Sequence, residues 1–315
     1  MKMKRGQIGI CIILFLLGSE SIAQTPSDGI MMDARKACVL ANYDAGTFDQ
    51  YWEGSLLRSN ETIATVHRNT ALPMAAIGIL DQLNLYLGAP YVSTHSTYPN
   101  GGKFAGANGF QDFYIGLKYR VFQKKMKQDN TLAGFLNVGF SAPMTNYLSD
   151  YMPYSIGFGA PELSYRGVLQ YELSKGPYIR AAAAYLWRGY TEAERDYYYN
   201  NGSYYTPWMD VPSAWNFEAV IGSWFLNKTL KVELAYNGLR SLSGDDIRPY
   251  NAPQPTNMVH WDRMGLSAQY FIEKVKGLSV LAYHTRVING RNAAKISNFG
   301  GGVTYQFNYL KSKNK

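Results

Sequence analysis

Several charged residues of this chain lie in largely apolar segments, where they fall on one of the two alternating sets of positions. Alternation brings charges of both signs onto one face of a strand. There they could form an electrostatic constriction that selects among solutes, as charged rings do in pores. Equally, a narrow interior could hold them as paired charges that only satisfy one another. The candidate residues are Lys118, Arg120, Glu162, Arg166, Arg180, Arg188, Glu218, Lys231, Glu233 and Arg286.

A second group of candidates is aromatic and lies in one long expected loop, residues 190–212. Clustered phenol rings could make a stacking surface for sugars or aromatic solutes. The alternative, which we favour, is an ordinary loop with aromatic rings near a membrane interface. The residues are Tyr197, Tyr198, Tyr199, Tyr204 and Tyr205.

Two acidic groups suggest metal or hydrolytic chemistry. Asp245 and Asp246 could ligate Ca²⁺ through carboxylate oxygens, but no longer series of spaced acidic ligands follows, and pairing with Arg248 is the simpler account. His260 and Asp262 have the i, i+2 spacing that an activated water would need. No serine motif, Cys/His metal spacing or phosphate-binding glycine loop accompanies them. We therefore expect no enzyme activity, metal or cofactor.

Alternating segments must position these charges. Three of them are Phe113–Val121, Leu132–Phe140 and Leu163–Tyr171, and in each an apolar face alternates with a mixed or charged face. A period of two predicts extended strands. The pattern recurs along the chain to Tyr309 and predicts an all-β fold of about 12 strands.

Loop lengths indicate the architecture. Short turns such as Ser174-Lys175-Gly176 follow every second expected strand, and longer loops such as residues 144–161 follow the others. This alternation predicts a closed transmembrane antiparallel β-barrel with periplasmic turns and periplasmic termini. Strands of about 9–12 residues suit a tilted crossing of a bilayer.

The cost of placing charge in lipid sets which strand face points inward. Lys or Arg on the lipid face at mid-bilayer costs about 2–4 kcal/mol. The charged faces, including that of Arg286, are therefore expected to line the lumen, and the apolar faces to contact lipid. A soluble β-sandwich would reverse this arrangement. The signal peptide, strand lengths and loop repeat favour the membrane barrel.

The start of the chain reads as an export signal. Residues 1–23 combine a basic start, the apolar run Ile8–Leu17 and the small-x-small site Ser21-Ile22-Ala23 before Gln24. The apolar run is too short to span a bilayer comfortably, and no other window predicts a transmembrane helix.

Three further boundaries complete the expected organisation. Residues 24–46 show no strand alternation and are expected to be a periplasmic or lumenal segment with a short helix at Met31–Leu40. The barrel is expected over residues 47–310, with its first two strands at Phe48–Leu57 and Thr62–Ile79, and 311–315 is a C-terminal tail. The net charge of +8 comes from scattered residues without a basic arm, so no nucleic-acid partner is expected.

Short segments spread over nearly the whole mature chain resemble the outer-membrane proteins of the phenol-degradation meta-pathway family, which are distantly related to the long-chain fatty-acid channels. The segments are Asp28-Gly29-Ile30-Met31-Met32, Tyr51-Trp52-Glu53-Gly54 with Arg58 and Asn60, Asn84 with Pro90-Tyr91-Val92, Gly109-Phe110-Gln111-Asp112 with Gly116-Leu117-Lys118-Tyr119, Gly244-Asp245-Asp246-Ile247-Arg248 and Gly290-Arg291-Asn292. The resemblance implies a transport-associated barrel for small aromatic or otherwise hydrophobic substrates. It transfers no functional residue.

Together these observations predict a channel in the cell outer membrane for uptake of small solutes, aromatic or otherwise hydrophobic. Outer-membrane lipid and a small-molecule solute are the expected partners. Two alternatives remain: a structural or secretion-accessory barrel without transport, and an outer-membrane barrel hydrolase.

Overall fold

A computed structural model describes residues 25–97, 106–248 and 253–310, and the expected signal peptide and C-terminal tail lie outside these ranges. Extended strands dominate the described residues, and one 3₁₀ turn spans Lys127–Asp129. The strands of the barrel wall are β1 (Lys36–Phe48), β4 (Val66–Leu80), β5 (Leu83–Gly88), β6 (Tyr91–Ser96), β7 (Gly106–Phe110), β8 (Asp112–Lys125), β9 (Thr131–Pro143), β10 (Glu162–Glu172), β11 (Pro177–Arg188), β16 (Ala214–Phe225), β17 (Leu230–Ser241), β18 (His260–Phe271), β19 (Leu278–Arg291) and β20 (Ser297–Asn308).

The wall closes on itself because β1 pairs antiparallel with both β4 and β20. Two wall positions are each built from two segments. β5 and β6 both pair with β4 and are separated at Pro90, which has no N–H to donate. β7 and β8 are likewise separated at Gln111. The fourteen segments therefore make twelve antiparallel strands among the described residues, which confirms the predicted fold class.

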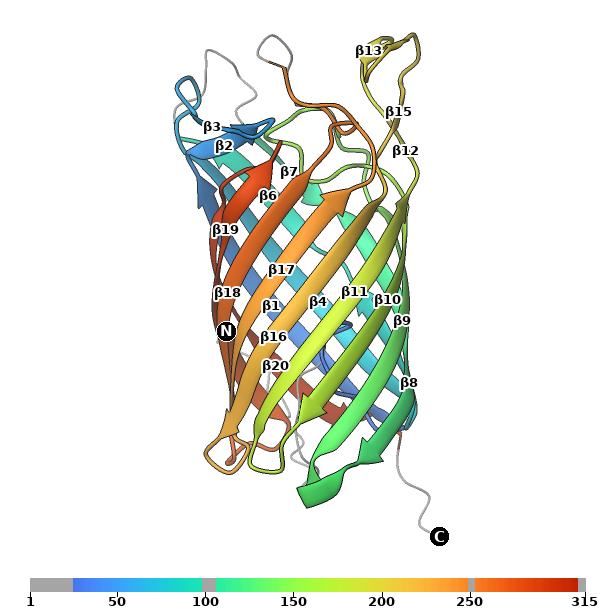
Figure 1. The fold of residues 1–315 in the computed structure, drawn as a ribbon, viewed down its shortest axis with the longest axis vertical. Coiled ribbons are helices and arrows are strands. Elements are labelled where there is room, and N and C mark those ends of the chain that lie inside the picture. The colour runs from blue at the N-terminus through green and yellow to red at the C-terminus, as the bar shows by residue number, and fades with distance from the viewer. Residues whose placement is uncertain (1–24, 98–105, 249–252, 311–315) are drawn as a thin grey trace, which may run out of the picture.

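The two ends of the barrel differ (Figure 1). Tight turns such as that between β10 and β11 gather at one end, called here the turn end, where β20 also finishes. The opposite loop end carries three short hairpins. These hairpins pair β2 (Gln50–Glu53) with β3 (Leu56–Ser59), β12 (Tyr190–Glu192) with β15 (Trp208–Asp210), and β13 (Tyr198–Tyr199) with β14 (Ser203–Tyr204).

Side-chain exposure follows the strand alternation. On β8, Leu117 and Tyr119 point outward and are each 46% exposed, while Lys118 between them is fully buried. The same rule leaves Ile179 and Ile221 exposed on the outer wall. An apolar exterior around a polar interior is the arrangement of a membrane barrel rather than of a soluble sandwich. No helix among the described residues is long and apolar enough to cross a membrane.

The start of the barrel corrects two predictions. The wall begins at Lys36 rather than at residue 47, and the residues predicted as a helix over Met31–Leu40 instead lead into β1. The alternation of apolar and polar residues is weak in β1, because its inward face mixes Leu40 with polar Asn42. The predicted wall strand Phe48–Leu57 is also wrong, because β1 ends at Phe48 and the residues after it form the β2–β3 hairpin.

The segment after β1 turns back on itself at the loop end. Gly54 has a left-handed φ of 55°, which allows the tight turn between β2 and β3. Trp52 is buried there against Gly290, where an added Cβ would lie 2.6 Å from the indole ring. The hairpin therefore packs on the barrel rim and forms no part of the wall. The next predicted strand, Thr62–Ile79, corresponds to β4.

Candidate functional site

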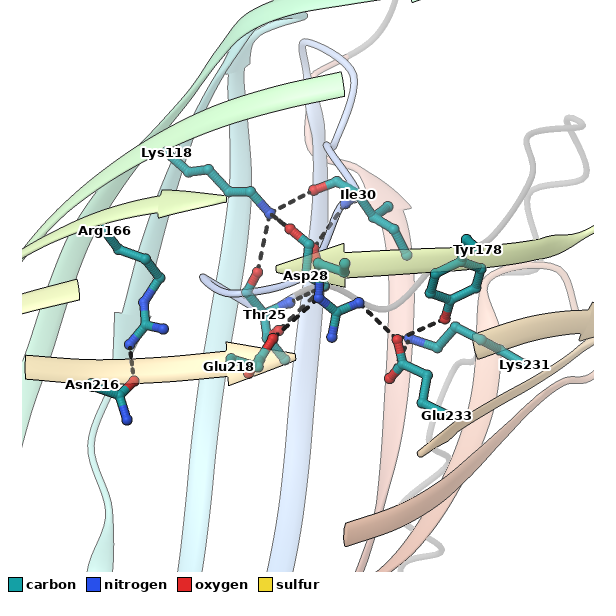
Figure 2. Close-up of polar contacts among 11 residues, drawn as sticks. Thr25, Asp28, Ile30, Lys118, Arg166, Tyr178, Asn216, Glu218, Lys231 and Glu233 are labelled. Carbon is teal, nitrogen blue, oxygen red and sulfur yellow. Dashed lines mark hydrogen bonds and ion pairs between the residues drawn. The ribbon is translucent and has the colours of Figure 1, made fainter. Parts of the chain in front are cut away.

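The N-terminal segment, residues 25–33, runs inside the barrel and is held there by Lys118 of β8 (Figure 2). The Lys118 ammonium donates to a carboxylate oxygen of Asp28 at 2.8 Å and to the Asp28 carbonyl at 2.7 Å. It also reaches the carbonyls of Ile30 at 3.0 Å and Thr25 at 3.3 Å. Lys118 is 0% exposed and Asp28 is 3% exposed.

This arrangement is one of the few ways to bury a lysine at acceptable cost. Taking an ammonium and a carboxylate out of water is offset only when their remaining hydrogen-bonding capacity is also satisfied. Here four oxygens surround the three donors of Lys118. Asp28 in turn accepts the backbone N–H groups of Ile30, at 2.9 Å, and Thr25. One ion pair thus folds the segment and fixes it to the wall.

Apolar contacts fit the same segment to the wall on either side. Met32 is buried with Tyr86 of β5, together with small residues of β1 and β4. Met31 packs on a cluster that includes Phe135 of β9. Close to its end, the carbonyl of Asp33 approaches β4 so tightly that a Cβ added to Gly78 would lie 2.0 Å from it. The segment is therefore packed into the lumen.

A second group of charges stands beside this segment, and we call it the charge network. Arg180 of β11 donates to Glu218 of β16 at 3.1 Å and to Glu233 of β17 at 2.8 Å. Lys231 lies 3.6 Å from the second oxygen of Glu233. The Tyr178 hydroxyl also donates to Glu233, at 2.6 Å. Side chains from three neighbouring strands thus converge on one point in the lumen (Figure 2).

Two cavities meet at the charge network. One, of about 460 Å³, reaches the turn end, where Lys228 and Lys276 are among its lining residues. The other, of about 290 Å³, lies between Asp28 and the inner face that carries Tyr283. Arg180 and Glu233 line both cavities. The N-terminal segment and the charge network therefore divide the lumen and narrow it at one level.

The remaining lumenal charges predicted from the sequence lie on either side of this level. Toward the loop end, Arg188 pairs with Glu162 at 2.8 Å. Arg166 donates to the side-chain oxygen of Asn216 at 3.1 Å. At the turn end, Arg120 lines the larger cavity and donates to a backbone carbonyl of the β4–β5 turn. The structure thus brings Lys118, Arg180, Glu218, Lys231 and Glu233 to the constriction, and the others flank it.

Arg286 is a correction, because it points away from the lumen. On β19, Ser279 and Val287 are buried, and the Tyr283 hydroxyl points into the lumen, where it accepts a hydrogen bond from the side-chain amide of Asn42 of β1 at 2.9 Å. Arg286 has the opposite parity and is exposed on the outer wall. Both faces of β19 are mixed, because Ser279 lies with Leu281 on the inner face and Val280 lies with Arg286 on the outer face, so the cost of charge in lipid assigned the wrong face to the lumen. The penalty for lipid-facing arginine falls to about 0–1 kcal/mol near the interface, and Arg286 lies in the loop-end half of β19.

Sequence reasoning missed two participants. Asp28 lies in a segment without strand alternation, so no pattern pointed to it. Arg68 of β4 was within a predicted strand, and alternation alone could have placed it in the lumen. It is half-buried and donates to the carbonyls of Ser155 and Ile156 in the β9–β10 loop, which folds into the loop end.

The tyrosine-rich loop lies apart from this site, at the loop end (Figure 1). Tyr198 stacks on Tyr204 across the β13–β14 hairpin, with ring centroids 5.0 Å apart. Tyr197 packs on Tyr205, which is 83% exposed. Tyr199 points elsewhere, under the guanidinium of Arg248 at 3.8 Å. The five rings therefore do not form one surface.

The acidic groups considered for chemistry have structural partners. Asp245 pairs with Arg248 at 3.0 Å, and burial raises the pKa of its carboxyl. Hydrogen bonds from Arg291 hold the pKa of Asp246 below its usual value. Among the described residues no group of three or more potential metal-ligating side chains assembles.

The His260 and Asp262 side chains are also engaged separately. Asp262 accepts hydrogen bonds from Tyr236 and Arg240, each at 2.6 Å, and from Asn289 at 3.0 Å. The His260 ring lies 3.2 Å from the Ser241 carbonyl. The pair that suggested hydrolysis is therefore not assembled as one unit.

Comparison with solved structures now places the fold. An outer membrane channel from Pseudomonas putida F1 superposes with a TM-score of 0.69 at 10% identity, over 90% of this chain and all of that one. The chain has the fold of an outer-membrane β-barrel. Two other barrels are more distant. The NalP translocator domain of Neisseria meningitidis superposes with a TM-score of 0.43 at 14% identity, over 86% of this chain and 88% of that one. The KdgM porin superposes with a TM-score of 0.42 at 7% identity, over 85% of this chain and 99% of that one. No protein-family model and no curated protein matches the chain.

Proposed function

We propose that this protein is an outer-membrane channel for small solutes, with its loop end outside the cell and its turn end in the periplasm. The observation that carries the proposal is the position of Arg180 and Glu233, which line both the larger and the smaller lumenal cavity. A solute passing between the two cavities must move past this pair. Tyr178, Glu218 and Lys231 surround the pair with charged and hydrogen-bonding groups, which a wet passage requires.

The permeant is small. Cavities of about 290 and 460 Å³ hold a molecule no larger than a small drug. The resemblance of the sequence to the phenol-degradation meta-pathway family supports aromatic or otherwise hydrophobic solutes. Apolar side chains such as Leu40, Met74 and Leu281 line the smaller cavity beside the charges, which suits a solute with an apolar body and a polar group.

The constriction has as many positive as negative side chains, which affects how ions pass. Lys118 is paired with Asp28, and in the separate charge network Arg180 and Lys231 oppose Glu218 and Glu233. A balanced site attracts neither sign strongly, so we expect a small conductance with little preference between cations and anions.

Liposome swelling with the refolded full-length mature protein tests the proposal. We expect swelling with small neutral and aromatic solutes, falling off steeply with solute size. Single-channel recording in a planar bilayer should give a small, stable conductance in the same preparation. A folded barrel that passes no small solute and no ions would overturn the channel proposal and favour the structural or secretion-accessory alternative.

A further inference from the structure

Arg286 belongs to a row of polar side chains on the outer wall. Arg286 faces its cross-strand partner Ser297 on β20, which in turn faces Thr47 on β1. Thr47 faces His67 on β4, and His67 faces His95 on β6. Strand parity places these side chains on the outside of the barrel, so a polar row crosses five neighbouring strands. With His284, they form what we call the wall patch.

Contacts within the wall patch hold its donors in place. The His284 ring nitrogen lies 3.1 Å from the Ser297 hydroxyl. The rings of His67 and His95 stack with centroids 4.7 Å apart and planes only 9° from parallel. His284 is further supported by Phe299, whose ring centroid is 4.2 Å away. The Ser297 hydroxyl and the His284 imidazole therefore lie next to Arg286, and the His67–His95 pair lies at the other end of the row.

The charge of Arg286 is not neutralised locally. Its neighbours Arg240 and Arg291 are paired with Asp262 and Asp246. Among the described residues no carboxylate forms an ion pair with Arg286. On the neighbouring β18, Asp262 is already engaged by Arg240, Tyr236 and Asn289. The wall patch therefore presents one permanent positive charge and several hydrogen-bond donors.

The level of the wall patch is set by the row of aromatic residues below it. Toward the turn end, Tyr43 of β1 faces Ala71, which faces Tyr91, which faces Phe110. These three rings are 40–56% exposed on the outer wall. Aromatic girdles mark the boundary between the hydrocarbon and the headgroups around a membrane barrel. The wall patch lies four residues nearer the loop end than this row, as Thr47 and Tyr43 show on β1, which is the side on which headgroups are expected.

We propose that the wall patch binds the phosphorylated headgroup of a glycolipid in the surrounding leaflet, of the lipid A type. Arginine suits a phosphate because its guanidinium donates two parallel hydrogen bonds to phosphate oxygens, and the hydroxyls of Ser297 and Thr47 can donate to the others. Below them, Phe299 and Val303 of β20 are exposed and apolar, 66% and 46%, and offer a surface for acyl chains. A free phosphate ion would leave that surface uncovered, so the combination fits a lipid.

Binding of diphosphorylated lipid A to the detergent-solubilised protein, followed by native mass spectrometry, tests this proposal. We expect the dephosphorylated form of the same lipid to bind at least tenfold more weakly. Arg286→Gln should weaken binding of the phosphorylated lipid by about tenfold, which corresponds to one charge-assisted hydrogen-bonded contact of about 1.4 kcal/mol. Arg286→Lys should recover part of the loss. Lys124→Gln, at an exposed position of the turn end, is the matched control and should bind like the natural protein.

Several results would overturn the proposal. The first is equal binding of the phosphorylated and dephosphorylated lipids. The second is binding of the phosphorylated lipid by Arg286→Gln that is as tight as by the natural protein. The third is displacement of bound lipid by inorganic phosphate as effectively as by unlabelled lipid. Release of a fatty acid that depends on Ser297 would do so as well, because the wall patch would then be catalytic. Since Arg286 lies outside the lumen, Arg286→Gln should leave channel conductance unchanged, so this test is independent of the proposed transport.

Discussion

At the scale of single residues, the ion pair between Lys118 and Asp28 determines where the N-terminal segment lies. It joins positions 90 residues apart in the sequence, and both side chains are almost fully buried. Removing one partner of a buried pair leaves the other charge unpaired and typically costs about 3–5 kcal/mol. The wall strands pair with one another and not with the segment, so we expect the cost to appear as release of the segment.

Lys118→Met is therefore expected to raise single-channel conductance and to make the N-terminal segment accessible to protease in detergent. The double variant Lys118→Met with Asp28→Asn removes both charges and is the control, since replacing both partners of a buried pair is far less costly than removing one. Planar-bilayer recording of the two variants checks the prediction. Equal conductance of Lys118→Met and the natural protein would show that the ion pair does not hold the segment.

The charge network leads to a prediction about ion selectivity. Glu218→Gln leaves Arg180 with Glu233 as its one carboxylate partner among the described residues and adds one unit of positive charge at the constriction. A unit charge close to an ion in a water-filled passage is worth about 1 kcal/mol, so the anion-to-cation permeability ratio should rise by a factor of a few.

Reversal potentials in a salt gradient measure this ratio. Arg286→Gln changes the net charge on the outer wall instead of in the lumen and should not move the reversal potential. An unchanged ratio in Glu218→Gln would place the ion path away from the charge network.

Most of the lumenal residues could be predicted from the sequence, because strand alternation and the cost of charge in lipid are local rules. Arg286 shows the limit of those rules. On β19 both faces mix polar and apolar side chains, so alternation does not choose between them, and the membrane level of a residue decides whether its charge is tolerated on the outer face. Asp28 could not be predicted, because its partner is specified only by the folded barrel.

At the scale of elements, β1 and the N-terminal segment were the parts that the sequence obscured. The wall was predictable where one strand face was uniformly apolar, as in β8 to β11. β1 lacks that uniformity, and its strand state depends on pairing with both β4 and β20. Tertiary pairing of this kind outweighs weak local preference.

Packing of the segment against β4 can be tested at one glycine. Gly78→Ala would place a Cβ 2.0 Å from the Asp33 carbonyl oxygen, so the segment must shift. Overpacking of this kind costs about 1–3 kcal/mol. We expect higher conductance and easier proteolysis of the N-terminal segment, as for Lys118→Met.

Gly167→Ala on β10 is the matched control, because no atom lies within 4 Å of its added Cβ. Both variants should still form closed barrels that resist denaturation by detergent at room temperature. Indistinguishable conductance in Gly78→Ala and Gly167→Ala would mean that the contact between β4 and the segment does not limit passage.

At the scale of the whole molecule, the orientation in the membrane connects the lumen and the wall patch. Loops outside and turns in the periplasm are expected for barrels of this kind. The same orientation places the wall patch in the outer leaflet, where a lipid A-type glycolipid would surround it. The proposed channel orientation and the proposed lipid binding therefore both require that the loop end faces outside the cell, and a single measurement can test this.

Cysteine labelling in intact Gram-negative cells tests that premise. Tyr205, directly after β14 at the loop end, is 83% exposed, and Lys228 lies in the turn between β16 and β17. With Cys38 replaced by Ser, Tyr205→Cys should react with a maleimide on a polymer too large for outer-membrane pores. Lys228→Cys should react only after the outer membrane is permeabilised. The opposite pattern would invert the barrel, and with the wall patch then in the inner leaflet, a lipid A-type ligand would be excluded.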